Sequence, residues 1–86
     1  MSPAELVVAL RVSFPAATVK EEILGSGAVW ISIWRGTDFV SIECSPALGF
    51  GVSLVSEEDP GFGGHDRVFS DASQVLAHVQ QLLAKR

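Results

Sequence analysis

The chain has 86 residues, which is the length of one domain, so we expect a single unit over residues 1–86. Its composition is 48% hydrophobic and 19% charged, which is typical of a globular protein and excludes a disordered one. The net charge is −4, with six basic residues scattered along the chain, so a phosphate backbone would be repelled and we expect no nucleic-acid partner.

The apolar runs, the first residues and the cysteine content of the sequence bear on membrane association, location and disulfide bonding. No apolar run approaches the roughly 20 residues that a membrane span requires, so we expect no membrane partner. The first residues lack the basic start of a secretory signal, which favours a cytoplasmic protein. The single cysteine, Cys44, excludes a disulfide within the chain, and its place on a predicted apolar sheet face indicates a small buried hydrophobic residue.

The N-terminal segment predicts a helix that begins at Ser2 and ends before Pro15. Ser2 is a favoured cap residue, and Glu5 three residues later completes a capping box. A strand competes, because apolar residues also recur at every second position here, but alternation does not explain the capping pattern. Residues 17–24 alternate charged and apolar side chains and predict a short charged edge strand, with a helix as the alternative.

The centre of the chain predicts an antiparallel meander. Residues 29–35, 38–44 and 50–55 are three runs with a period of two. If Gly36 takes a positive φ in a two-residue hairpin turn, Trp34 pairs with Phe39 and every apolar residue meets another apolar residue. One sheet face is then wholly apolar, and the reverse face mixes aromatic residues with serines.

The C-terminal part predicts a long loop, a short strand and a helix. Residues 56–66 have no periodicity, and residues 67–69 suit a short additional strand. Ser70 or Asp71 then caps an amphipathic helix whose apolar stripe should lie across the apolar sheet face. We therefore predict an α+β fold, a two-layer sandwich with an N-terminal helix, an antiparallel β-meander of three to four strands, and a C-terminal helix packed on one sheet face.

The predicted loop carries five side chains that suit a hard cation: Glu57, Glu58, Asp59, His65 and Asp66. Their spacing matches neither an EF-hand nor a zinc motif, so a solvated loop is favoured over a metal site. A small-ligand or divalent-metal-binding protein that uses this Gly-rich acidic loop is the alternative function. We assign no metal and no cofactor.

An enzyme is the less favoured class. His65 beside Asp66 offers a general base and a carboxylate, but adjacent loop residues rarely direct their side chains together. No activated nucleophile accompanies them, so we assign no catalytic residue. His78 falls on the polar side of the last helix and is interpreted as a surface residue.

The reverse face of the predicted sheet is the most specific feature. It gathers Trp30, Trp34 and Phe39, with Glu43 and Arg35 as charged neighbours. Aromatic cross-strand pairs stabilise a sheet, so one interpretation is purely structural, with a helix or the loop covering the rings. The other is an exposed surface that contacts a protein partner.

We favour a non-enzymatic protein-interaction domain that binds a protein partner, or forms a homodimer, through the aromatic sheet face or the acidic loop. Small acidic domains of this general shape include toxin-neutralising immunity proteins, an analogy of size and shape alone. In an immunity-type role, an acidic surface would dock on the basic active site of a toxin that acts on nucleic acid.

Overall fold

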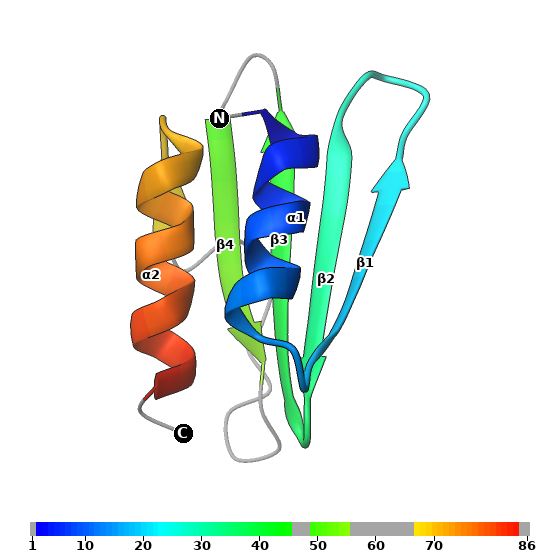
Figure 1. Cartoon of the computed structure of the whole chain (residues 1–86). Helices are drawn as coiled ribbons and strands as arrows, with labels where there is room; N and C mark the ends of the chain where they lie inside the picture. The colour runs from blue at the N-terminus through cyan, green and yellow to red at the C-terminus, as the bar shows by residue number, and fades with distance from the viewer. Residues whose placement is uncertain (1, 46–48, 56–66, 85–86) are drawn as a thin grey trace.

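The structure, a computed structural model, describes residues 2–45, 49–55 and 67–84, and forms two layers (Figure 1). In chain order the elements are α1 (Pro3–Ser13), β1 (Thr18–Ile23), β2 (Val29–Arg35), β3 (Asp38–Ser45), β4 (Gly49–Val55), β5 (Arg67–Phe69) and α2 (Ala72–Ala84). The strands form one antiparallel sheet in the order β1-β2-β3-β4-β5. The predicted α+β sandwich is confirmed, with a charged edge strand at β1 and the additional short strand at β5.

The register of β2, β3 and β4 is the predicted one. Trp34 lies opposite Phe39, and Ile42 lies between Ile31 on β2 and Val52 on β4. Gly36 takes a φ of 62° in the turn between β2 and β3, as the hairpin requires. Because strand side chains alternate between faces, a slip of one residue would have turned the whole apolar set to solvent.

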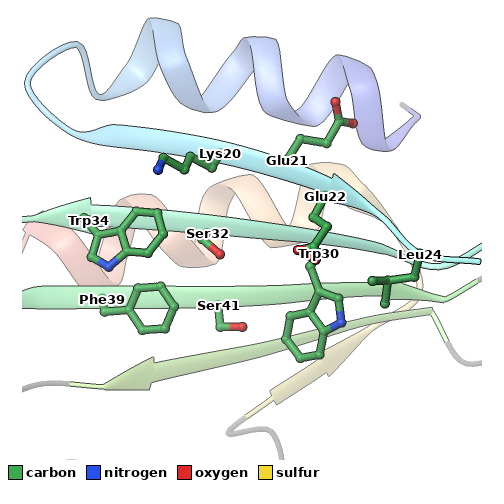
Figure 2. A pocket seen from close by; sticks show the side chains of 9 residues that line it. All are labelled: Lys20, Glu21, Glu22, Leu24, Trp30, Ser32, Trp34, Phe39 and Ser41. Carbon is green, nitrogen blue, oxygen red and sulfur yellow. The ribbon is translucent and has the colours of Figure 1, made fainter.

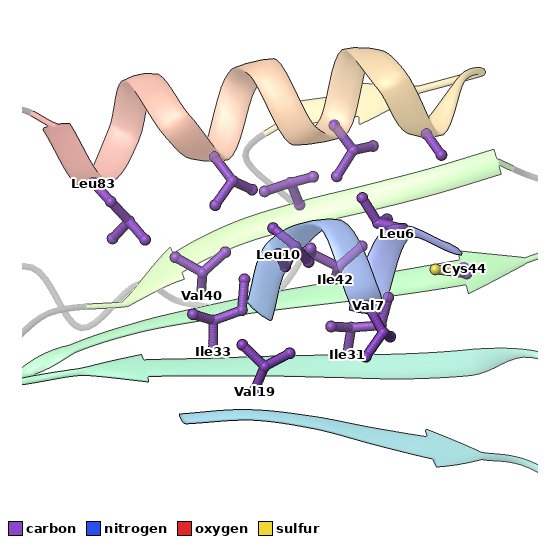
Figure 3. Close-up of a cluster of buried hydrophobic side chains, with 14 residues drawn as sticks. Leu6, Val7, Leu10, Val19, Ile31, Ile33, Val40, Ile42, Cys44 and Leu83 are labelled. Carbon is purple, nitrogen blue, oxygen red and sulfur yellow. The ribbon is translucent and has the colours of Figure 1, made fainter. Parts of the chain in front are cut away.

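Both helices pack on the apolar face of this sheet, where they complete one hydrophobic core (Figures 1 and 3). The buried helical residues are Leu6, Val7 and Leu10 on α1 and Ala72, Val75, Val79 and Leu83 on α2. Val8 and Val12 are 60% and 76% exposed on α1. Apolar residues therefore surround α1, which is why a strand pattern competed with the helix. Neither α1 nor α2 has the length and apolar character that crossing a membrane would require.

Hydrogen bonds close the start of each helix. The Oγ of Ser2 accepts from the backbone N–H of Glu5 at 3.2 Å, and the Oε1 of Glu5 accepts from the N–H of Ser2 at 2.9 Å. The hydrogen bond that the carboxylate of Glu5 accepts from the backbone N–H of Ser2, and next an interaction with the Ser2 hydroxyl, hold the pKa of the Glu5 carboxyl below its ordinary value. At α2, the Oδ1 of Asp71 accepts from the N–H of Ser73 at 3.0 Å, so Asp71 rather than Ser70 is the cap.

Arg35 lies on the helical side of the sheet. Its guanidinium donates a hydrogen bond to the carbonyl oxygen of Leu83, near the end of α2. A cation is favourable there because the last carbonyl groups of a helix carry partial negative charge. Arg35 follows Ile31 and Ile33 at a period of two, so alternation alone assigns it to the helical side. This corrects the expectation that Arg35 borders the aromatic face.

Candidate functional site

The candidate site lies on the sheet face opposite the helices, which we call the aromatic face. Since α1 and α2 both pack on the other side, no helix of the described residues covers it (Figure 1). The alternation of β1, β2 and β3 directs one set of side chains to it. This set is Thr18, Lys20, Glu22, Trp30, Ser32, Trp34, Phe39, Ser41 and Glu43.

A hollow of about 630 Å³ opens on the aromatic face. Figure 2 shows Trp30 at one end and Trp34 with Phe39 at the other, while Ser32 and Ser41 lie side by side between them. Serine side chains are much shorter than indole or phenyl rings, so the two serines form the floor of the hollow and the aromatic rings form its walls at either end. Four residues at or beyond β1 border the hollow along its length, namely Lys20, Glu21, Glu22 and Leu24.

The aromatic pair at one end is held in place. The rings of Trp34 and Phe39 stack with centroids 5.0 Å apart and planes inclined by 28°. The Nζ of Lys20 lies 5.6 Å from the centroid of the Trp34 ring, within the range of a cation–π interaction. Trp34 nevertheless remains 41% exposed, while Phe39 is half-buried. A fixed and accessible indole is a good contact for another molecule.

The two ends of the hollow differ in charge. Register pairs Trp30 with Glu22 on one side and with Glu43 on the other, so carboxylates flank this indole in its cross-strand row. Lys20 is near Trp34 at the opposite end. The hollow therefore runs from an acidic end to a basic one, which would give a bound chain a preferred direction.

The structure brings together four of the five residues predicted to bind a partner. Trp30, Trp34, Phe39 and Glu43 share the aromatic face, and Arg35 is on the other side. The sequence placed Ser32 and Ser41, the serine floor of the hollow, on this face but did not assign them to the site, and it did not assign Lys20 or Glu22. Alternation along β1 contained the signal for the two charged residues, but it needed the register of β1 on β2, which no turn pattern specified.

The predicted acidic loop lies outside the described residues. Glu57, Glu58, Asp59, His65 and Asp66 all belong to it, so the metal-binding and ligand-binding interpretations of this loop stay predictions. Within residues 2–45, 49–55 and 67–84, the His, Cys, Asp and Glu side chains form no group of three that could hold a metal ion.

His78 is half-buried, which corrects its interpretation as a surface residue. Its ring lies 5.1 Å from that of Phe69, at an angle of 50° between the planes. Phe69 is on β5, and this short strand brings it beneath α2, where it packs against the hydrophobic core. Sequence alone could not place so short an edge strand against the helix.

A second hollow, of about 470 Å³, lies on the helical side near the start of α1 and includes Cys44 in its wall. Cys44 is only 3% exposed. Burial raises the pKa of its thiol to about 11, and the negative charges of Glu21 and Glu43 add to the effect. The buried, inert cysteine expected from the sequence fits this environment, because only the thiolate is strongly nucleophilic.

We expect Cys44 to resist alkylation in the folded chain. At about pH 8, a pKa raised by roughly two units lowers the thiolate fraction about a hundredfold, and burial slows the reagent further. Iodoacetamide labelling followed by mass spectrometry, in buffer and in concentrated urea, measures the ratio. Equal rates in the two solvents would show that the thiol is accessible and contradict this prediction.

No protein-family model, curated protein or solved structure matches this chain in the comparisons with known proteins.

Proposed function

We propose that this chain is a non-enzymatic protein-interaction domain that binds a partner protein through the aromatic face. The observation that carries the proposal is the accessibility of Trp34 beside a hollow walled by aromatic rings. Tryptophan is among the residues that contribute most to protein interfaces, because one side chain buries a large area at a small cost in conformational entropy.

Preorganisation supports the same function. Trp34 is stacked on Phe39 and lies under the cation of Lys20, so its ring loses little freedom when a partner covers it. The hollow would accept a protruding apolar side chain, and the serine floor can donate and accept hydrogen bonds with a backbone above it. The acidic and basic ends would then align the partner segment along β2 and β3.

Affinity capture from the source cell tests this proposal with three baits: the parent chain, Trp34→Ser and Val12→Ser. Val12 is a matched control, because it is 76% exposed but lies on α1, on the other side of the sheet. We expect a partner that the parent and Val12→Ser baits recover equally. Truncating a central interface tryptophan costs about 2 kcal/mol or more, so Trp34→Ser should reduce recovery at least tenfold.

Binding by Trp34→Ser as strong as that of the parent would contradict the proposal. Thermal melting of each bait establishes that the three chains are equally folded. Loss of the partner by Trp34→Ser can then be attributed to the changed surface and not to unfolding. For a partner identified in this way, titration of a Trp30→Phe chain should shift the fluorescence of Trp34, because its exposed ring becomes buried.

A further inference from the structure

The free edge of β1 has a defined backbone pattern. β1 is the outermost strand of the sheet in Figure 1 and pairs only with β2 among the described strands. The N–H of Leu24 donates to the carbonyl of Ala28 at 2.8 Å, which continues the β1–β2 ladder through the even-numbered residues. In an antiparallel pair, the residues that alternate with the hydrogen-bonded ones direct their N–H and C=O groups away from the neighbouring strand. In β1 these residues are Val19, Glu21 and Ile23.

A hydrogen bond from Arg11 independently indicates that the backbone carbonyl of Val19 points away from β2. The guanidinium Nη2 of Arg11 donates to the carbonyl oxygen of Val19 at 3.2 Å, and α1 packs against β1, so the carbonyl of Val19 does not bond β2. Arg11 thus occupies one end of the edge. The backbone groups of Glu21 and Ile23 continue the same edge, and the side chain of Ile23 is 74% exposed. A strand that presents backbone groups in this way is a template for a second strand.

Two copies of β1 are complementary in one antiparallel register, with Glu21 opposite Glu21 of the second copy. Lys20 then faces Glu22 of the second copy, and the reciprocal pair repeats the contact on the same sheet face. On the other sheet face, Ile23, which is 74% exposed, comes opposite Val19 of the second copy; Val19 is only 7% exposed in the core, so this pair adds little to the contact.

Neighbouring registers are worse. The residues of the two copies whose backbone groups point outward must lie opposite one another. The nearest alternative registers that satisfy this condition are centred on Lys20 or on Glu22. These bring two lysines or two glutamates directly opposite one another, and they lose both opposite-charge pairs. Two features limit the strength of the pairing in the best register. The two Glu21 side chains lie opposite one another, and the carbonyl of Val19, which would accept from the N–H of Ile23 of the second copy, already accepts from Arg11.

We propose that two copies of this chain associate by antiparallel pairing of their β1 strands, centred on Glu21, into one continuous ten-stranded sheet. Each copy contributes its only long free edge among the described strands, since β5 at the opposite edge has three residues. The assembly therefore closes as a two-fold dimer. The two-fold axis is perpendicular to the sheet, so the two aromatic hollows lie next to each other on one side. This inference uses the sheet edge and is independent of the proposed function of the aromatic face.

Charge reversal tests the register. In Lys20→Glu, both cross-strand contacts between copies become glutamate against glutamate, and in Glu22→Lys both become lysine against lysine. An equimolar mixture of these two variants forms opposite-charge pairs at both positions, and so does the double variant Lys20→Glu/Glu22→Lys. We expect each single variant to dissociate at least about tenfold more readily than the parent, and the mixture and the double variant to recover the parent affinity.

Sedimentation velocity between about 10 µM and about 1 mM measures this association, because small interfaces are weak. The control is Arg67→Glu, which changes the net charge by the same amount as Lys20→Glu but lies on β5, at the far edge of the sheet. It should leave the dissociation constant unchanged. Glu21→Gln removes the one like-charge contact and should tighten the dimer severalfold.

Three results would overturn the inference. The parent chain could remain monomeric at about 1 mM, well above the range in which a specific small interface assembles. The mixture of the two single variants could fail to associate although each is folded by circular dichroism. Finally, Trp34→Ser could abolish the dimer, which would place the contact on the aromatic face. Loss of an external partner by Trp34→Ser with an unchanged dimer, in contrast, tests the proposed function alone.

Discussion

Gly49→Ala should lower the free energy of unfolding by about 3 kcal/mol or more. Gly49 begins β4 with a φ of 89°, in the left-handed region where a side chain is strained. A Cβ added there would also lie 2.5 Å from the carbonyl oxygen of Phe69 in β5. The opposing atom belongs to a backbone and cannot rotate away, so β4 and β5 must separate and pull Phe69 from beneath α2.

Two glycines of the β1–β2 turn separate these causes. Gly27 has a φ of 90° but nothing within 4 Å of an added Cβ, so Gly27→Ala should cost only the backbone strain, about 1–2 kcal/mol. Gly25 has neither feature, and Gly25→Ala should be neutral or slightly stabilising. Urea unfolding of the three variants measures the series. Equal losses of unfolding free energy for Gly49→Ala and Gly27→Ala would show that moving β5 away from the added Cβ costs no free energy, and would contradict this prediction.

Ile42→Ala should lower the free energy of unfolding by about 2–5 kcal/mol. Ile42 is 0% exposed at the centre of β3, between Ile31 and Val52, and the helices cover it. Truncation removes buried methyl groups and leaves a cavity among neighbours that cannot collapse on it. A chain of this length has a total stability of roughly 4–13 kcal/mol, so the variant should melt far below the parent.

The same substitution at Ile23 is the matched control, because that side chain is 74% exposed. Ile23→Ala should cost less than about 1 kcal/mol, mainly through the lower strand preference of alanine. Both variants are best compared by urea unfolding at low micromolar concentration, where association through β1 is negligible for a weak interface. A loss at Ile23 as large as that at Ile42 would contradict the burial that distinguishes them.

Local patterns predicted much of the fold. Period-two alternation and the Gly36 turn specified the pairing of Trp34 with Phe39 and of Ile31 with Ile42, and the structure confirms both. The capping residue Ser2 likewise marked the start of α1. These features could be predicted because each depends on residues close together in the chain, where geometry follows directly from side-chain chemistry and backbone preference.

Contacts between distant segments were beyond the same reasoning. The hydrogen bond from Arg35 to Leu83, the tilted ring contact of His78 with Phe69 and the hydrogen bond from Arg11 to Val19 each require a helix docked at a particular place on the sheet. The buried side of α1 was equally ambiguous, because apolar residues surround that helix and several rotations about its axis would bury similar area.

The amino-acid sequence by itself determined strands β2, β3 and β4, their register, and the gathering of Trp30, Trp34 and Phe39 on one face, because these follow from alternation and short connections. Only the tertiary structure decided that both helices pack on the opposite face and that Lys20 and Glu22 border a hollow of short serines. The reason is that the position of a helix on a sheet depends on the total area that many side chains from distant segments bury together, and a local sequence pattern does not specify that total.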